Sequence, residues 1–212
     1  MRCPSAAEQD ASVAVVSREA CQVFHEYSVL VRGHKEDERL HSQTDSREVA
    51  RERVHIVAAQ PEHAADQAEV FYQAVMQGAA GHYDLAQRQQ WAARVPRDAE
   101  RWAARQHRFE VLVAERDARC IGFCEYAPEW PLARIEMLYV YPSLMGQGIG
   151  SQLLAAAERD LRERKVRVMS LEASLTLSPG LARRGWHSLG LEHVKRDDVC
   201  LKRERFEKRL DQ

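Results

Sequence analysis

The stretch Gly146-Gln147-Gly148-Ile149-Gly150 stands between two apolar runs that differ in periodicity. The run before it, residues 134–142 (RIEMLYVYP), is rich in β-forming residues and is closed by a proline, which predicts a strand over residues 134–141. The run after it repeats apolar residues at helical spacing and predicts a helix over residues 148–164. The local order is therefore strand, glycine-rich turn, helix.

This turn has the chemistry of a phosphate receptor. Glycines allow a positive φ and let a ligand come close to the backbone. The amides in the first turn of a helix have no intrahelical partner, and they lie at the positive end of the helix dipole. Together these features predict a site for phosphate or pyrophosphate.

Three other interpretations of the turn compete with this one. A Walker loop needs Gly-Lys-Ser/Thr, but Gly150 is followed by Ser151 and the loop holds no lysine. A dinucleotide fingerprint needs two spacers before its third glycine and a long parallel sheet, and too little chain follows residue 150 to build one. A tight strand-to-helix turn without a ligand is the remaining alternative.

The segment resembles the acyl-CoA site of the GNAT superfamily of N-acyltransferases. In that family a strand reading Leu-Tyr-Val-x-Pro is followed by Gln/Arg-Gly-x-Gly-Ile/Val-Gly and a helix, and residues 138–142 and 146–150 follow this pattern. Met145 departs from it, because the family usually has Gln or Arg there. The resemblance covers residues from about Val54 to Leu210.

The rest of the chain is expected to build one sheet around this unit. Strands are predicted over residues 54–57, 109–114, 119–126, 134–141, 166–171, 186–196 and 199–207, and helices from Gln60 and over residues 85–93, 98–105, 148–164 and 179–184. The β-α-β unit should be parallel with a right-handed crossover, and the hairpins antiparallel. The expected fold is α/β and GNAT-like, with a mixed, mostly antiparallel sheet, one parallel βαβ unit and helices on both faces.

Two domains of unequal size are expected. Residues 1–53 read as an N-terminal extension with one candidate helix over residues 17–31 and a charged linker, and residues 54–212 as the GNAT-like acyl-CoA-binding acyltransferase domain. The extension has either no part in the chemistry or a role in docking a partner.

Charge and cysteine usage exclude several classes of protein. The net charge of −1 over 212 residues does not favour nucleic acid as a partner. The C-terminal third is locally basic, which predicts a solvated face; the alternative is that Arg183 or Arg184 holds CoA phosphates. No long apolar run or signal pattern occurs, so neither a membrane span nor secretion is expected. The odd number of cysteines favours free thiols in a reducing cytoplasm, and no spacing predicts a metal site. Cys120 and Cys124 are expected on one face of the same strand.

The resemblance implies direct transfer of an acetyl group from the cosubstrate acetyl-CoA to a primary amine. It places a polarising main-chain amide near Leu138 or Val140 and makes Glu136 the candidate general base, the alternative being a glutamate in solvent or paired with Arg134 or Arg119. The residues that it assigns to cofactor binding are Leu138, Tyr139, Val140, Met145, Gly146, Gln147, Gly148, Ile149, Gly150, Ser151 and Ser174. The acceptor is a small-molecule amine or a peptide, and a homodimer is compatible with the resemblance.

The general acid is missing from its usual place. The family often carries a tyrosine at the position of Leu181, which has no proton to donate. Water, Tyr139 or Tyr141 are the substitutes. A non-catalytic acyl-CoA-binding module is therefore the second hypothesis, and a nucleotide-binding regulator the third.

A softer pattern, Tyr83 followed by Gln87 or Gln89 and then Trp91, resembles one branch of small GNAT acetyltransferases. Four residues lie where the family builds its acceptor pocket, and for each of them ordinary packing is favoured over an acceptor contact. They are His82, Tyr83, Tyr126 and Trp130.

Overall fold

The computed structural model describes residues 53–129 and 131–211, so the candidate helix over residues 17–31, the linker that follows it and Trp130 lie outside the described residues. The strands are β1 (His55–Ala58), β2 (Glu110–Arg116), β3 (Arg119–Ala127), β4 (Leu132–Val140), β5 (Val168–Ser174), β6 (His187–Arg196) and β7 (Val199–Arg209). The helices are α3 (Ala64–Gln73), α4 (Leu85–Ala92), α5 (Ala99–Gln106), α6 (Ile149–Glu163) and α7 (Ser178–Ala182). A π-helical turn, η2 (Ala74–Gly78), extends α3, and two 3-10 turns, η1 (Pro61–His63) and η3 (Pro142–Leu144), precede α3 and the glycine loop.

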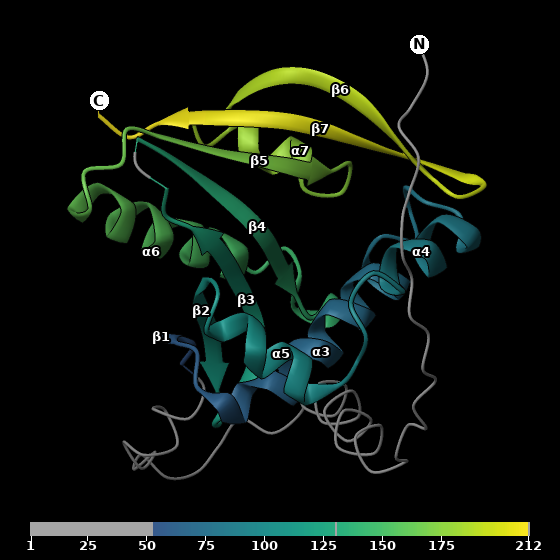
Figure 1. Ribbon diagram of the computed structural model, residues 1–212, viewed down its shortest axis with the longest axis horizontal. Coiled ribbons are helices and arrows are strands. Elements are labelled where there is room, and N and C mark those ends of the chain that lie inside the picture. The colour runs from purple at the N-terminus through teal and green to yellow at the C-terminus, as the bar shows by residue number, and fades with distance from the viewer. Residues whose placement is uncertain (1–52, 130, 212) are drawn as a thin grey trace, which may run out of the picture. The chain divides into compact units, whose positions relative to one another are not determined.

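The seven strands form one sheet in the order β1-β2-β3-β4-β5-β7-β6 (Figure 1). Within the described part of the chain, only β4 and β5 pair in parallel, and α6 connects them; the other neighbours are antiparallel. The predicted fold class is confirmed. The strand and helix positions agree with the sequence to within a few residues, the usual uncertainty at element ends.

Helices cover both faces of the sheet, and each face has its own apolar core (Figure 1). On one face, α6 buries Leu153, Leu154 and Leu161 against β3, β4 and β5. On the other face, α3 and α5 bury Phe71 and Trp102 against β2 and β3. A fully buried leucine contributes about 1.5–3 kcal/mol, so the α6 face alone holds the glycine loop firmly to the sheet.

An irregularity in the pairing of β2 with β3 shifts side chains from one face of the sheet to the other. Ala114 pairs with Gly122 but Glu115 pairs with Cys120, so β3 carries an extra residue between them. Because side chains alternate along a strand, one extra residue reverses the faces beyond it. Cys120 therefore packs in the α3 core and Cys124 in the α6 core, and the expectation that both share a face is wrong.

The parallel pairing of β4 with β5 is short. It runs from Leu132 opposite Val168 to Ile135 opposite Leu171 and then stops, although β4 continues to Val140 and β5 to Ser174. The remainder of β5 pairs only with β7. The two central strands therefore diverge, and among the described residues one edge of the β4 backbone has no strand partner beyond Ile135.

Candidate active site

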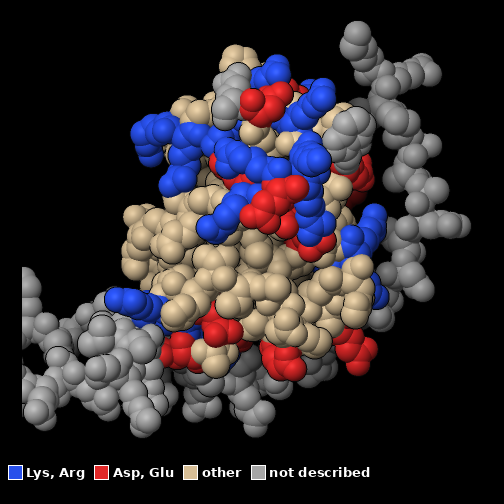
Figure 2. All heavy atoms as spheres, turned by 90° about the vertical axis from the view of Figure 1, so that its left-hand side faces the viewer, with Lys and Arg blue, Asp and Glu red and all other residues tan. Residues whose placement is uncertain are grey.

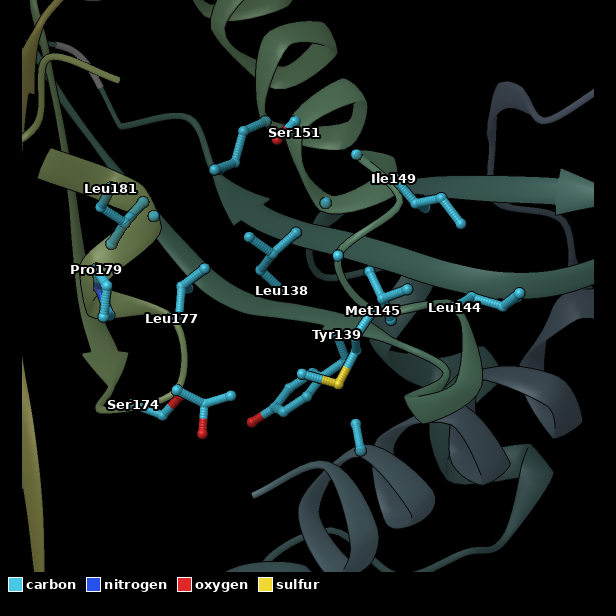
Figure 3. Close-up of a pocket in the computed structure, with 18 of the residues that line it drawn as sticks. Leu138, Tyr139, Leu144, Met145, Ile149, Ser151, Ser174, Leu177, Pro179 and Leu181 are labelled. Carbon is cyan, nitrogen blue, oxygen red and sulfur yellow. The ribbon is translucent and has the colours of Figure 1, made fainter. Parts of the chain in front are cut away.

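A pocket of about 650 Å³ occupies the gap between the diverging strands. Figure 3 shows β4 with Leu138 and Tyr139 on one side of the pocket, and α7 with Pro179 and Leu181 on the other. The glycine loop and the first turn of α6 close a third side. The lining residues are Ala74, Ala79, Trp91, Leu138, Tyr139, Val140, Leu144, Met145, Gly146, Gly148, Ile149, Gly150, Ser151, Leu154, Ser174, Thr176, Leu177, Pro179, Gly180, Leu181, Arg183 and Arg184.

The glycine loop turns the chain by two left-handed residues. Gly146 has φ +81° and Gly148, the N-cap of α6, has φ +85°, a conformation that side chains other than glycine rarely adopt. A Cβ at either position would meet no described atom within 4 Å, so the space beside the loop is open. Among the described residues, no acceptor is paired with the amides of Gly148, Ile149 or Gly150. These amides are available to an anion at the positive end of α6.

The predicted cofactor residues lie together with one exception. All of them line the pocket except Gln147, whose side-chain amide donates to the carbonyl of Ser143 at 3.3 Å. Met145 packs its sulfur against η2, since a Cβ at Gly78 would lie 2.9 Å from that sulfur. Arg183 and Arg184 also line the pocket, as the alternative interpretation of the basic C-terminal third requires.

Glu136 lies where β4 leaves β5, but it is not among the residues that line the pocket. It is the extra residue of a second bulge, because Met137 pairs with Glu125 and Ile135 with Tyr126. Its carboxylate lies 3.2 Å from Nε of Arg134, and Nη2 of Arg134 also bonds Glu172 on β5 at 2.8 Å. The Glu136 side chain keeps 25% of its surface exposed, so it is paired with arginine without being sealed from solvent.

Two residues that line the pocket bear on which group could act as the general acid. Leu181 is fully buried in α7 and lines the pocket with an apolar side chain. Tyr139 lines the pocket and accepts a hydrogen bond from Nε1 of Trp91 at 3.2 Å, whereas Tyr141 does not line it. Burial raises the pKa of Tyr139 to about 12, so its hydroxyl keeps its proton at neutral pH. In Figure 3 this hydroxyl points toward the side of the gap on which Ser174 lies.

The sequence did not single out two buried polar groups near the site. Glu125 on β3 is 1% exposed and is held by Nε of Arg105 at 2.9 Å, and burial raises the pKa of its carboxyl. The hydroxyl of Thr176 lines the pocket and has no hydrogen-bond partner among the described residues. The only sequence signal for Glu125 was the presence of an acid within the apolar run of residues 120–127. No sequence pattern marked Thr176 as part of the pocket.

Of the residues considered for an acceptor pocket, Tyr126 is buried in the core and His82 is exposed. Tyr126 is 2% exposed and donates to a carboxylate oxygen of Asp160 at 2.8 Å, and neither residue lines the pocket. Five of the basic residues of the C-terminal third form ion pairs with acids among the described residues, namely Arg162, Arg164, Arg203, Lys208 and Arg209. Figure 2 shows Lys and Arg interleaved with Asp and Glu on one face of the molecule. Ion pairs join both Arg162 and Lys208 to Glu158. The paired charges fit a solvated face.

The chain belongs to the GNAT acetyltransferase family: the model of the "Acetyltransferase (GNAT) family" matches residues 71–186. The match runs from the last turn of α3 to just beyond α7 and so includes all the residues that line the pocket. A comparison with curated proteins found no match.

Several solved structures share the fold. A GCN5-related N-acetyltransferase from Rhodopseudomonas palustris is 26% identical with a TM-score of 0.66, over 74% of this chain and 95% of that chain. PaiA N-acetyltransferase from Thermoplasma acidophilum, solved with coenzyme A, is 21% identical with a TM-score of 0.59, over 74% and 99%. YncA, a putative acetyltransferase from Salmonella typhimurium solved with acetyl-CoA, is 19% identical with a TM-score of 0.58, over 76% of this chain and 95% of that chain.

Within the described residues, no helix is both long and apolar enough to cross a bilayer.

Proposed function

We propose that the protein is an N-acetyltransferase that moves an acetyl group from acetyl-CoA directly to a primary amine of a small molecule or peptide. The observation that carries the proposal is the meeting of unpaired amides at residues 148–150 with a gap between two diverging parallel strands. Family membership and the relatives solved with coenzyme A or acetyl-CoA support the same cosubstrate.

The residues present fit acetyl-CoA. The loop amides and the guanidinium groups of Arg183 and Arg184 supply donors and positive charge for phosphates. The free backbone edge of residues 136–140 suits the amide groups of the pantetheine arm, and Ser174 adds a hydroxyl on the opposite wall. Acetyl-CoA would supply the acetyl group as an activated thioester.

In this proposal the chain acts mainly by position. Holding the thioester beside a bound amine can lower the barrier by roughly 7–11 kcal/mol. A main-chain N–H near Leu138 or Val140 polarises the carbonyl, and Glu136 accepts the proton of the amine, directly or through water. Arg134 orients that carboxylate through their ion pair. Tyr139, the tyrosine of the two candidates that lines the pocket, donates its proton to the thiolate that departs as the thioester C–S bond breaks. Solvent then returns a proton to Tyr139 and takes the amine proton from Glu136.

A second candidate function is binding of acyl-CoA without catalysis. Leu181 in place of a tyrosine and the pairing of Glu136 with Arg134 favour it. In that case the pocket binds CoA and no thiol appears when an amine is added.

Two assays separate the candidates. Calorimetry should show binding of CoA under both, whereas release of free thiol from acetyl-CoA with an amine panel should occur only for the enzyme. If the protein binds ATP or NAD and has no affinity for CoA, both candidate functions are wrong and the nucleotide-binding regulator is supported.

We also propose a cytoplasmic location. The three cysteines in the described part of the chain, Cys120, Cys124 and Cys200, are free thiols, as a reducing compartment favours. Cell fractionation tests this, and recovery only from an oxidising compartment would contradict it.

A further inference from the structure

The hydroxyl of Tyr83 lies at the point where β5 stops pairing with β7. The last pair of that ladder is Ser174 opposite Arg203, so the next pair in register would be Leu175 opposite Lys202. In its place, the Tyr83 hydroxyl accepts from the amide of Leu175 at 3.0 Å and donates to the carbonyl of Lys202 at 2.6 Å. One side-chain hydroxyl therefore stands between the two backbone groups that would form the next hydrogen bond of the ladder.

Tyr83 is itself firmly held. It is 5% exposed, its amide donates to the carbonyl of Ala79, and its carbonyl accepts from Nε of Arg88. Burial raises the pKa of the phenol, so the hydroxyl stays protonated and can both donate and accept. Asp84, the next residue, caps α4 through a reciprocal pair of hydrogen bonds with Gln87.

The chain that Tyr83 redirects forms a wall of the pocket. Beyond Ser174 it turns tightly, because the amide of Leu177 and the hydroxyl of Ser178 both donate to the Ser174 carbonyl. Ser174, Thr176 and Leu177 line the pocket on the side opposite β4. Without the hydroxyl, the amide of Leu175 could pair directly with β7, and this wall would move.

The same residue connects this wall to β4. The ring of Tyr83 packs edge-on against Trp91 with centroids 5.3 Å apart, and Trp91 donates to the hydroxyl of Tyr139 on β4. Past Ile135 the two strands share no backbone pairing. The contacts of Tyr83 and Trp91 therefore join the two sides of the gap through α4.

We propose that Tyr83 is a positioning residue: its hydroxyl ends the β5–β7 ladder, directs residues 175–177 into the pocket wall and so sets the width of the gap that receives the pantetheine arm. The proposal rests on the proposed binding of acetyl-CoA at this pocket. In this proposal the Tyr83–Gln87–Trp91 pattern shapes the pocket and does not contact the reacting atoms.

The test compares CoA binding by calorimetry in the wild type, Tyr83→Phe and Gln87→Glu. Tyr83→Phe keeps the ring contact with Trp91 and removes only the hydroxyl, so the Kd for CoA should rise roughly tenfold, and the KM for acetyl-CoA should rise with little change in kcat. Gln87→Glu is the matched control. It retains an oxygen for the Asp84 cap but loses the donor that bonds the carbonyl of Cys200 on β7, so binding should stay within about twofold of wild type.

Equal affinity of the wild type and Tyr83→Phe overturns the proposal, as does an equal loss in Gln87→Glu, which would indicate general docking of α4 on β7. If Tyr83→Phe does not fold, hydrogen exchange of the Leu175 amide in the wild type decides. Protection comparable to that of β5 supports the bridge, and exchange at the rate of an open loop overturns it. A wild type that binds no CoA contradicts the proposed function, whereas the exchange measurement still tests the bridge.

Discussion

Ile135 and Leu171 form the last parallel pair between β4 and β5, and beyond them each strand turns to a different neighbour. β4 stays with β3 as far as Val140, whereas β5 stays with β7 as far as Ser174. The pocket, the glycine loop and the candidate base all lie beyond this pair.

Substitution of Gly148 by alanine should weaken both the fold and CoA binding. The residue has φ +85°, which costs a side chain about 1–2 kcal/mol, and the new methyl group would project into the open space beside the loop. Chemical unfolding and calorimetry measure the two effects. Gly81→Ala is the control, because its φ is ordinary and a Cβ there meets nothing within 4 Å. Identical CoA affinity in the two variants would contradict the site.

Glu136→Gln should lower the rate of thiol release roughly a hundredfold while leaving the affinity for CoA unchanged, because a neutral amide cannot take the proton of the amine. Glu172→Gln is the matched control, since it removes the other carboxylate that Arg134 bonds. An unchanged rate in Glu136→Gln, or the same loss in both variants, would remove Glu136 as the base.

Tyr139→Phe should reduce thiol release about tenfold with little effect on CoA affinity, because the variant keeps the ring in the pocket and loses the proton donor. Tyr141→Phe, which alters a tyrosine outside the pocket lining, should behave like the wild type. If Tyr139→Phe turns over at the wild-type rate, the proton for the thiolate comes from water.

Arg105→Ala should destabilise the protein by about 3–5 kcal/mol, since it leaves the buried Glu125 carboxylate without its cation. Burial already raises the pKa of Glu125, and loss of Arg105 removes two influences that lower it. A raised folded pKa means that the folded state binds a proton which the unfolded state releases, so stability grows as pH falls. The variant should therefore recover part of its loss between pH 7 and pH 5 in urea unfolding. A loss that is the same at both pH values would show that the carboxylate is not the cause.

Cys200 should react with iodoacetamide in the folded protein, whereas Cys120 and Cys124 should react only after unfolding. Both of the latter are fully buried, and burial raises the pKa of each thiol, so little thiolate forms. Peptide mapping by mass spectrometry reads the sites separately. Rapid labelling of Cys124 without denaturant would place the α6 core in an open state.

Periodicity and the glycine loop were sufficient to predict the fold. The run ending at Pro142 and the helical repeat from Ile149 fixed the parallel unit, and the turn residues placed the hairpins around it. The resemblance to the GNAT family assigned a set of cofactor residues that, apart from Gln147, line one pocket. These features depend on local sequence, which is why they could be predicted.

Features that depend on strand register could not be predicted. One extra residue near Ile121 sends Cys120 and Cys124 to opposite faces, and another at Glu136 places the candidate base in a bulge beside Arg134. The bridge from Tyr83 to β5 and β7 joins segments far apart in the chain. A single sequence carries no signal for such pairings, because the partner of a residue depends on how the strands pair in the folded sheet and not on its neighbours in the sequence.

The central claim is that the amides of residues 148–150 bind the pyrophosphate of CoA at the mouth of the gap. The most direct measurement is an ¹⁵N NMR titration of the wild-type protein with CoA. The account predicts large, saturable shifts of the Gly148, Ile149 and Gly150 amides, together with smaller shifts along residues 136–140. Saturable binding of CoA that leaves these amide resonances in place, or no binding at all, would contradict it.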